Sequence, residues 1–540
     1  MRRSFAQRAS HDRAIRARFV ILGCVLAGLV LRLALLIHAG WRYDYDEGMV
    51  GLQVLRIMRG EYPVFHPGQP YLGALESYLT IPLFHLFGAN AVTLKLLPWL
   101  LSGAYVGATG WLGERVFERQ VGALSALLAA LAPPYLLIVG MKTWGATAET
   151  LVLGNVALIA TTYAVDGSRS APERARALVL LGLIAGVAFW LSWLFAFYAL
   201  PVAVVLFWRG RDVPRWAWLG AALAFGAGSA PFWIYNVEHP LATFRYFFDG
   251  PDTFHATTAQ VLDHMVNDLG PRLVSGDPLW RRLSWPAIWW LQAVYEGGAA
   301  LLVLWVVRGR WNAAQRPARL LLALFALGAP VIYVASGWGN RAINAFGFDA
   351  TGRYLLVLHS VIPIGAAAAA VALARWRHWM RPLGAAVATS VIVLNLLGAV
   401  RADPVKAFTS PYYMRQPVTL EPLIAFLDRQ GITAVWTDVG VAHVLMFETH
   451  ERILAADWYD IYAAKGLLRF PDVPVEIAQA DRVAFVEVIL PGQTDTHIER
   501  AFDASGVPYA ATRVAPDLLV IVPFAPVDPA ILGDGLGYQF

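Results

Sequence analysis

The sequence is poor in charged residues and has almost no cysteine. Of its 540 residues, 15% are Asp, Glu, Lys or Arg, against about 25% in a typical soluble domain. The single cysteine, Cys24, excludes a disulfide framework and a cysteine-rich metal centre. Residues 401–540 hold no phosphate loop, no zinc-ligand spacing and no catalytic triad. The net charge of +5 does not indicate nucleic-acid binding, because much of the Lys and Arg lies in short loops between apolar runs.

Long apolar runs are the main feature that is present. The chain is 58% hydrophobic, with a mean hydropathy of +0.52. These runs predict an α-helical polytopic membrane protein. A basic segment, 1–18, precedes the first run, which has no small-residue cleavage site and is expected to be an uncleaved anchor. We expect eleven spans, at 19–40, 91–112, 121–139, 146–165, 177–193, 194–208, 216–236, 286–307, 318–337, 353–374 and 382–400.

Charge bias predicts the orientation. The run 71–87 is short and contains Glu76, His85 and Pro82. If it lies in the interface, every arginine-rich connection falls on the side of the N-terminus, which is the side expected to face the cytoplasm. Residues 177–208 hold either two short helices turning near Ser192 or a single crossing, and a single crossing would invert everything after it.

This topology gives a transmembrane domain over 19–400 and a C-terminal extracytoplasmic domain over 401–540. The first external loop, 41–90, is expected to hold interfacial helices at 47–59 and 71–87, and a second long external loop covers 237–285. The C-terminal domain has an α/β pattern and is interpreted as a lid or a partner-docking module. Its expected strands are 432–437, 482–488 and 518–522, and its expected helices are 421–429 and 496–504.

Three carboxylates crowd together at the start of the first external loop. Asp44, Asp46 and Glu47 lie within four positions of one another at a membrane surface. Acids so close to hydrocarbon are costly unless water, a cation or a substrate receives them. An interfacial loop with solvated charges remains the simpler interpretation.

Several motifs of the membrane part resemble a known family. They are Asp46-Glu47, GQPYLGALE at 68–76, PLFHLFG at 82–88, LKLLP at 94–98 and GRYLL at 352–356. Together they resemble the membrane glycosyltransferases of the GT-C fold, in the branch related to protein O-mannosyltransferases and lipid A aminoarabinose transferases. The resemblance implies an inverting glycosyltransferase. Its donor would be a polyprenyl-phosphate sugar, and its acceptor a lipid, polysaccharide or protein outside the cytoplasm.

The resemblance also implies roles for the acids. Asp46 matches the first-loop Asp of the family and is expected to be the general base, because an attacking hydroxyl must lose its proton. Glu47 would orient the acceptor or hold the loop, and Asp44 is the alternative base. Glu149 takes the place of a second family acid and would bind the sugar or the acceptor. A water-facing carboxylate is the alternative for Glu149, and a solvated surface position is the expectation for Glu76.

A phosphate leaving group needs cationic partners. Arg341 and Arg353 bracket the fourth external loop and are the first candidates, followed by Lys142. Tyr71 and Gln69, in the motif 68–76, are also expected at the substrate. Gln69 stands where some relatives have a Lys, and Met49 stands where they have an Arg three residues after the catalytic Asp. The donor is therefore expected to be held differently or to carry another headgroup.

Other functions remain open at this stage. The family leaves a divalent cation, Mg or Mn, possible, and the His spacing in the loop 237–285 gives no metal-ligand pattern. A transporter or lipid-linked flippase is an alternative, although no internal repeat is found. A non-catalytic scaffold is another. The sequence does not give the sugar, hexose or pentose. The expected location is a bacterial inner membrane.

Overall fold

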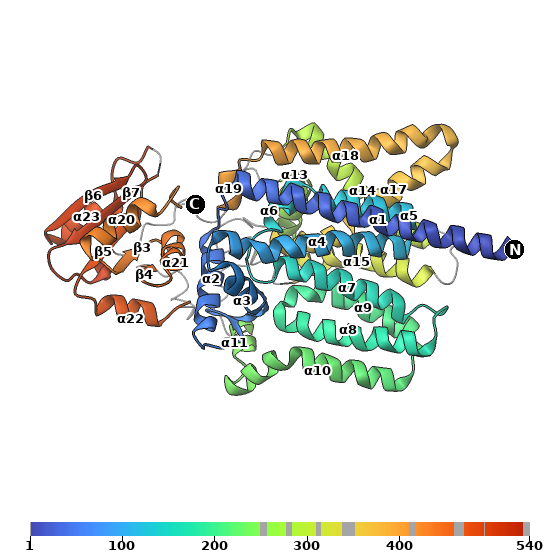
Figure 1. The fold of residues 1–540 in the computed structure, drawn as a ribbon, viewed down its shortest axis with the longest axis horizontal. Helices are drawn as coiled ribbons and strands as arrows, with labels where there is room; N and C mark the ends of the chain where they lie inside the picture. Colours follow the sequence, from blue (N-terminus) through green and yellow to red (C-terminus); the bar gives the residue numbers. More distant parts are fainter. Residues whose placement is uncertain are drawn as a thin grey trace.

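The computed structural model describes residues 2–248, 256–276, 283–308, 315–336, 352–409, 416–457, 469–490 and 492–532. It has two parts, a helix bundle and a small domain with a sheet (Figure 1). The bundle begins with α1 (Arg2–His38) and ends with α18 (Arg381–Arg401), and the sheet domain follows it in the chain. The N-terminus lies at the end of the bundle far from the sheet domain.

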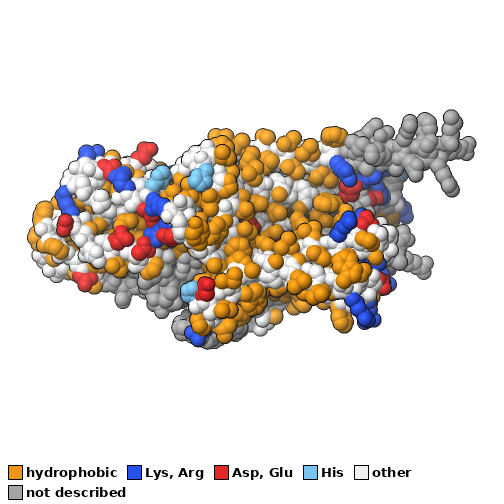
Figure 2. Space-filling model, turned by 60° about the horizontal axis from the view of Figure 1, so that its bottom comes forward, with side chains coloured by type: hydrophobic (Ala, Val, Ile, Leu, Met, Phe, Trp, Pro, Cys, Tyr) orange, Lys and Arg blue, Asp and Glu red, His pale blue; other side chains and the backbone are white. Residues whose placement is uncertain are grey.

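The bundle has the character of a membrane domain. Apolar side chains cover the visible side of the bundle, and Lys and Arg gather at the end where the N-terminus lies (Figure 2). Such a band is what a lipid-facing surface requires, and the chain is a multi-pass integral membrane protein. In the described residues, nine segments are long and apolar enough to cross a membrane: Arg18–His38, Ala91–Val116, Ala171–Leu191, Trp193–Asp212, Arg215–Glu238, Trp285–Trp305, Arg316–Ala335, Arg353–Trp376 and His378–Arg401.

Two predicted spans are not among these nine. The segment 121–139 is broken into α5 (Arg119–Ala130) and α6 (Pro134–Val139). The break falls before two consecutive prolines, because proline removes a backbone donor and ends a helix. The segment 146–165 forms α7 (Thr147–Ala164). The number of eleven crossings therefore stays a prediction.

Residues 177–208 form two helices. α8 (Ala171–Leu191) and α9 (Ala196–Arg209) are joined by the short turn Trp193–Phe195. Ser192 is extended, and its Oγ accepts a backbone N–H at the start of that turn, at 3.3 Å. The predicted turn at this point is confirmed.

Arginine-rich connections meet at one end of the bundle. Arg319 Nε donates to the carbonyl of Val116 at 3.3 Å, and Arg115 forms an ion pair with Asp166. These contacts join the connection between α4 (Ala91–Val116) and α5 to the α7–α8 connection and to the start of α15 (Arg316–Ala335). The other long helices of the bundle are α10 (Arg215–Glu238), α14 (Trp285–Arg308) and α17 (Ile362–Trp376).

The first loop holds two short helices, α2 (Tyr45–Met58) and α3 (Leu75–Phe87), between the bundle and the sheet domain (Figure 1). Between them β1 (Phe65–His66) and β2 (Gln69–Gly73) form an antiparallel hairpin. The prediction of a helix from residue 71 is therefore wrong at its start. The extended backbone of 69–73 is instead paired, and β2 also bridges to the α8–α9 turn.

The long loop 237–285 contacts this hairpin through its first helix. Its helices are α11 (Ala242–Phe248), α12 (Thr258–His264) and α13 (Gly270–Ser275). In α11, Thr243 Oγ1 donates to the carbonyl of Pro70. The hairpin is thus held between α8 and α11.

The C-terminal domain is built on a five-stranded sheet in the order β4-β3-β5-β7-β6. β4, β3 and β5 run parallel, and β7 and β6 continue the sheet antiparallel. All three predicted strands and both predicted helices are confirmed, while β4, β6 and two helices were not predicted. The elements are α20 (Glu421–Gln430), β3 (Ala434–Thr437), α21 (Val439–Glu448), β4 (Leu454–Asp457), α22 (Asp472–Ala478), β5 (Val483–Val488), α23 (His497–Ser505), β6 (Tyr509–Ala515) and β7 (Leu518–Pro523).

The first loop and the sheet domain share one hydrophobic core. Val50 and Leu52 of α2 and Phe84 of α3 are buried in the same cluster as Leu445 of α21 and the strands of the sheet. Glycine permits this contact: a Cβ at Gly51 would lie 2.6 Å from the ring of Phe447, which packs against Phe84. The sheet domain is therefore packed on α2 and is not a freely tethered module.

Candidate functional site

The three acids of the first loop lie at the N-terminus of α2, and two of them cap it. Asp44 Oδ1 accepts from the backbone N of Glu47 at 3.1 Å, and Glu47 Oε2 accepts from the backbone N of Asp44 at 3.1 Å. This is a reciprocal capping box. The local sequence explains it, because an Asp three residues before a Glu satisfies two free helix-end donors. Asp46 lies between them and is not part of the box.

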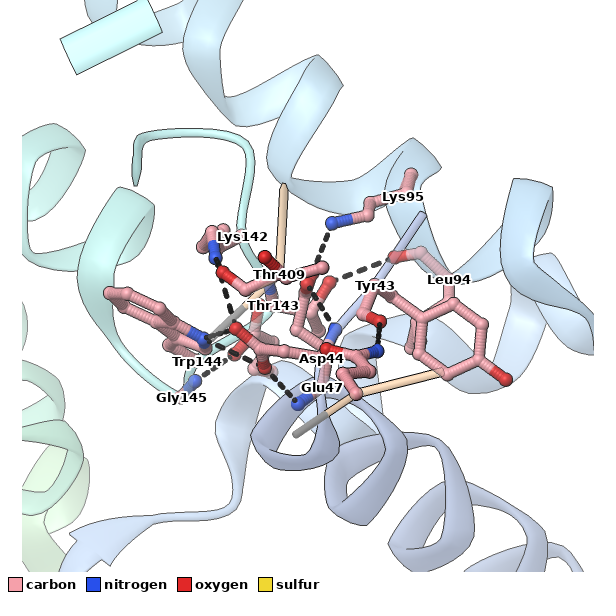
Figure 3. A network of polar contacts seen from close by, with 12 residues as sticks. Tyr43, Asp44, Glu47, Leu94, Lys95, Lys142, Thr143, Trp144, Gly145 and Thr409 are labelled. Carbon is pink, nitrogen blue, oxygen red and sulfur yellow. Dashed lines mark hydrogen bonds and ion pairs between the residues drawn. The ribbon is translucent and has the colours of Figure 1, made fainter. Parts of the chain in front are cut away.

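Two fully buried lysines neutralise the capping acids (Figure 3). Lys95 of α4 forms an ion pair with Glu47 Oε1, and Lys142 Nζ lies 3.0 Å from Asp44 Oδ2. Lys142 also donates to the carbonyl of Thr409 at 2.7 Å. Burial raises the pKa of Glu47, and the ammonium of Lys95 opposes that rise. Buried ions need such partners, because a lone buried charge is costly.

The turn after α6 provides the remaining donors to these carboxylates. The backbone N of Thr143 donates to Glu47 at 2.9 Å, and Trp144 Nε1 donates to Asp44 at 2.9 and 3.1 Å. Gly145 N donates to the carboxylate of Glu76 on α3. Gly145 (φ 65°) and Ala146 (φ 80°) are both left-handed, which turns the backbone sharply before α7 begins. One short turn thus binds three acids of the first loop.

Asp46 has a different partner. Its Oδ1 lies 2.9 Å from Nη2 of Arg469, a residue of the sheet domain, and its side chain is 15% exposed. Burial raises the pKa of Asp46, while Arg469 and Arg353 oppose the rise and Asp44 adds to it. Asp46 is therefore an acid at the boundary between bundle and sheet domain, and it is partly exposed.

A second pair of acids lies behind the turn. Glu76 and Glu149 are both buried, and neither oxygen of Glu149 has a partner among the described groups. Burial, followed by the neighbouring Glu149 carboxylate, raises the pKa of Glu76 well above its usual range. The expectation that Glu76 is solvated is wrong, and so is the alternative that Glu149 faces water. A buried carboxylate without partners needs a donor from outside the protein or a proton.

His66 lies beside these acids and is also unpaired within the described structure. Both its ring nitrogens are buried without a hydrogen-bond partner, and a Cβ at Gly145 would lie 2.6 Å from Nε2. Burial, with Arg469 nearby, lowers the pKa of His66 to about 3. The ring is therefore neutral at physiological pH.

The other predicted substrate residues are only partly assembled. Tyr71 stacks on Tyr246 at 4.7 Å between ring centroids, and Arg353 is close enough to influence the pKa of Tyr71, which burial raises. The backbone of Gln69 is paired with the backbone of His66 in the hairpin. Arg341 lies outside the described residues. Arg353 is thus close enough to influence the pKa of both Tyr71 and Asp46.

Lys142 and Asp44, which we expected at the substrate, instead engage each other in the buried network (Figure 3). Their role at a substrate stays a prediction. Four residues of this region were not predicted from the sequence: Lys95, Trp144, His66 and Arg469. A single cation in the apolar run 94–98 was a usable signal for Lys95. Arg469 had none, because it is one of many charges in the C-terminal part.

Comparison with protein-family models and with curated proteins finds no match. Solved structures do match. ArnT from Cupriavidus metallidurans bound to undecaprenyl phosphate has a TM-score of 0.62 at 14% identity, over 93% of this chain and 98% of that chain. The oligosaccharyltransferase of Archaeoglobus fulgidus, tethered with an acceptor peptide, has a TM-score of 0.51 at 12% identity, over 94% of this chain and 74% of that chain.

The chain has the GT-C fold. The fold predicted from the first-loop motifs is thus confirmed, and the match to ArnT extends over nearly all of both chains, so it includes the sheet domain. Sequence identity this low carries the fold and leaves the chemistry to be argued from the residues.

A metal ion was left open for this GT-C chain. A second Archaeoglobus fulgidus oligosaccharyltransferase structure, with a TM-score of 0.51, is a complex with Zn and sulfate. Here, the residues that the structure describes include no group of three or more His, Cys, Asp or Glu that could hold a metal ion. Within that part of the chain, the donors therefore form no ligand set.

Proposed function

We propose that the protein is a membrane glycosyltransferase. It moves one sugar from a polyprenyl-phosphate-linked donor to a lipid, glycan or protein acceptor. The observation that carries the proposal is Asp46: in a GT-C fold, it is the one of the three acids at positions 44, 46 and 47 that lies outside the capping box, and its side chain is 15% exposed. ArnT, which shares the fold, has been solved with undecaprenyl phosphate.

The reaction needs one base. An acceptor hydroxyl attacks the anomeric carbon and forms a new C–O bond, while its proton passes to Asp46. The bond between the anomeric carbon and the phosphate oxygen breaks, and the polyprenyl phosphate leaves with the electron pair. A single displacement of this kind inverts the anomeric centre. A positioned carboxylate contributes about 10²–10⁴-fold to such a step.

Charge on the departing phosphate needs a cation near Asp46. Arg353 supports this role, because it is close enough to Asp46 to lower the pKa of that acid. Arg offers two N–H donors to phosphate oxygens. Arg341 remains the second candidate from the sequence. The oxygens of Glu149 have no hydrogen-bond partner among the residues that the structure describes, and we assign them to hydroxyl or amine donors on the substrate.

The arrangement also supports an orientation. The arginine-rich connections gather at one end of the bundle, and Asp46 and the sheet domain lie at the other. Arginine-rich short loops face the cytoplasm. We therefore infer that the N-terminus is cytoplasmic and that transfer takes place on the outer face of a bacterial inner membrane.

Mass spectrometry of envelope glycans and glycolipids tests the proposal. Four strains are compared at matched protein levels: a deletion, and complements with wild type, Asp46→Asn and Glu173→Gln. The last is the matched control, because Glu173 caps α8 at the other end of the bundle. We expect one sugar-sized mass to be lost in the deletion, restored by wild type and by the control, and still absent with Asp46→Asn.

A transfer that Asp46→Asn restores as fully as wild type would remove Asp46 from the mechanism. If the deletion strain has unchanged glycans, the proposed glycosyltransferase activity is rejected, and a scaffold or a flippase is favoured.

A further inference from the structure

Arg469 comes from the sheet domain, yet its guanidinium lies at the N-terminus of α2. Nη2 is 2.9 Å from Asp46 Oδ1, and Nη1 contacts Met49 Sδ on the same helix. Asp46 and Met49 are three residues apart, so both point from one face of α2. The side chain of Arg469 is only 7% exposed. This buried cation joins the sheet domain to α2 through the carboxylate of Asp46.

The surroundings fix the position of Arg469. The neighbouring Phe470 packs edge-to-face on His443 at 5.6 Å between centroids, and Arg56 of α2 lies 4.6 Å above its ring. Arg56 in turn pairs with Glu451 at 2.7 Å. The backbone that carries the guanidinium is therefore held by α2 and α21 together.

Arg469 also lines a hollow of the sheet domain. The hollow has a volume of about 50 Å³ and lies where the parallel strands β3 and β4 end, bordered by α21 and α22. In open α/β sheets, this carboxyl edge is where polar groups converge. The side chain thus extends from that edge to the acid on α2.

We propose that Arg469 is a positioning residue for the transfer: it fixes Oδ1 of Asp46 and so presents Oδ2 to the acceptor hydroxyl. The inference rests on the proposed function. It makes the sheet domain a structural component of the active site, in place of the lid or docking module that the sequence indicated. No atom of Arg469 takes part in bond making.

The ionisation of Asp46 then depends on a small set of groups. Arg469 faces it from the sheet domain, Arg353 from the segment before α17, and Asp44 from the same loop. Two neutral rings, His66 and His443, surround the guanidinium. Without Arg469 the repulsion from Asp44 persists, and Arg353 is the cation that still opposes it among the residues that the structure describes. Because a cation stabilises a carboxylate, its removal raises the pH at which Asp46 gains a proton.

The test measures the protonation of Asp46 directly. A hydrophobic carbodiimide reacts with protonated carboxyls, and tandem mass spectrometry locates the adduct on Asp46 apart from Asp44 and Glu47. Wild type, Arg469→Gln and Arg469→Lys are labelled across a pH series in detergent. Arg452→Gln is the matched control, because Arg452 pairs with Asp428 on the exposed side of the same domain.

We expect the pH of half-labelling to rise by about one unit in Arg469→Gln, a tenfold change in proton affinity. It should change little in Arg469→Lys and not at all in Arg452→Gln. The acid limb of the transfer rate should move by the same amount in Arg469→Gln. Where the Gln variant does not fold, Arg469→Met keeps the apolar stem against Met49 and gives the same comparison.

An unchanged half-labelling pH in a folded Arg469→Gln or Arg469→Met protein would overturn the inference. Labelling does not require turnover, so the two proposals fail separately. If the labelling curve shifts in Arg469→Gln but the wild-type protein transfers no sugar, the proposed glycosyltransferase activity is rejected, and the effect of Arg469 on Asp46 stands. Active wild type with no shift would reject Arg469 alone.

Discussion

Lys142 Nζ lies 3.0 Å from Asp44 Oδ2, and this ion pair is buried between the turn after α6 and the N-terminus of α2. Removing the charge of Asp44 leaves Lys142 buried without its counter-ion. We expect Asp44→Asn to lower the free energy of unfolding by about 3–5 kcal/mol. Thermal unfolding of purified protein measures it.

The partner variant, Lys142→Met, completes a double-mutant cycle. Because each single change leaves one charge unpaired, the double variant should be more stable than the sum of the two predicts. Additive losses would show that the pair contributes nothing specific. If Asp44→Asn stays fully stable but loses transfer, Asp44 becomes the base in place of Asp46.

Neutralising Glu149 should not destabilise the protein, in contrast to neutralising Asp44. Its two oxygens are buried and have no partner in the described part of the chain, so a neutral side chain is easier to bury there. We expect Glu149→Gln to keep or raise the unfolding midpoint while transfer falls about tenfold, as for loss of one substrate hydrogen bond. Transfer assays at matched protein levels measure the second effect.

Glu76→Leu provides the contrast to this variant. It removes the acceptor for the N–H of Gly145 and should cost about 1–3 kcal/mol. If Glu149→Gln destabilises the protein as much as Glu76→Leu does, Glu149 has a structural partner and no ligand role follows.

Gly51→Ala should loosen the sheet domain. The new Cβ would lie 2.6 Å from the ring of Phe447, which is itself packed on Tyr43 and Phe84 and has little room to move. Overpacking of this kind costs about 1–3 kcal/mol. Gly107→Ala on α4 is the control, because its nearest neighbour is Val25 at an ordinary 3.6 Å. Limited proteolysis should release the sheet domain earlier in Gly51→Ala only.

Acid should destabilise the same interface through two histidines. Burial lowers the pKa of both His66 and His443 to about 3, with Arg469 adding to the effect. The unfolded chain, with a pKa near 6.5, binds more protons than the folded one, so stability falls as the pH drops below that value. At pH 5, each ring should cost about 2 kcal/mol.

The unfolding midpoint at pH 7.5 and at pH 5 tests this. His443→Phe removes one titrating ring and should show a smaller fall between the two pH values than wild type. An equal fall in both proteins would place the acid sensitivity elsewhere.

Much of the fold could be predicted because long apolar runs and short strand patterns can be recognised from neighbouring residues alone. The turn at Ser192 and the strands around Trp436, Phe485 and Val520 follow from such patterns. The β-hairpin did not, because the extended backbone of 69–73 is paired with β1, bridged to Ser192 and hydrogen-bonded by Thr243 of α11, which are contacts that the helical pattern of the sequence does not contain. The helix predicted from residue 71 therefore began earlier than the observed helix α3, which starts at Leu75.

The site divides in the same way. The acids at 44, 46 and 47 could be found because three carboxylates beside an apolar run are rare. Their assignment could not, because it depends on Lys95, Trp144 and Arg469, which are distant in sequence. Whether an acid is capped or accessible is decided by such partners and not by its own neighbours.

The shared core between α2 and the sheet domain has a consequence for biogenesis. Arg56 and its partner Glu451 are 395 residues apart. At about 5–20 residues per second, roughly 20–80 s pass between the synthesis of the two. During that interval the apolar face of α2 stands at the membrane surface without its cover. This face must be covered by the membrane interface or by a chaperone until the sheet domain is made. If translation stalls before residue 439, the inserted bundle is left with an exposed apolar surface that can aggregate.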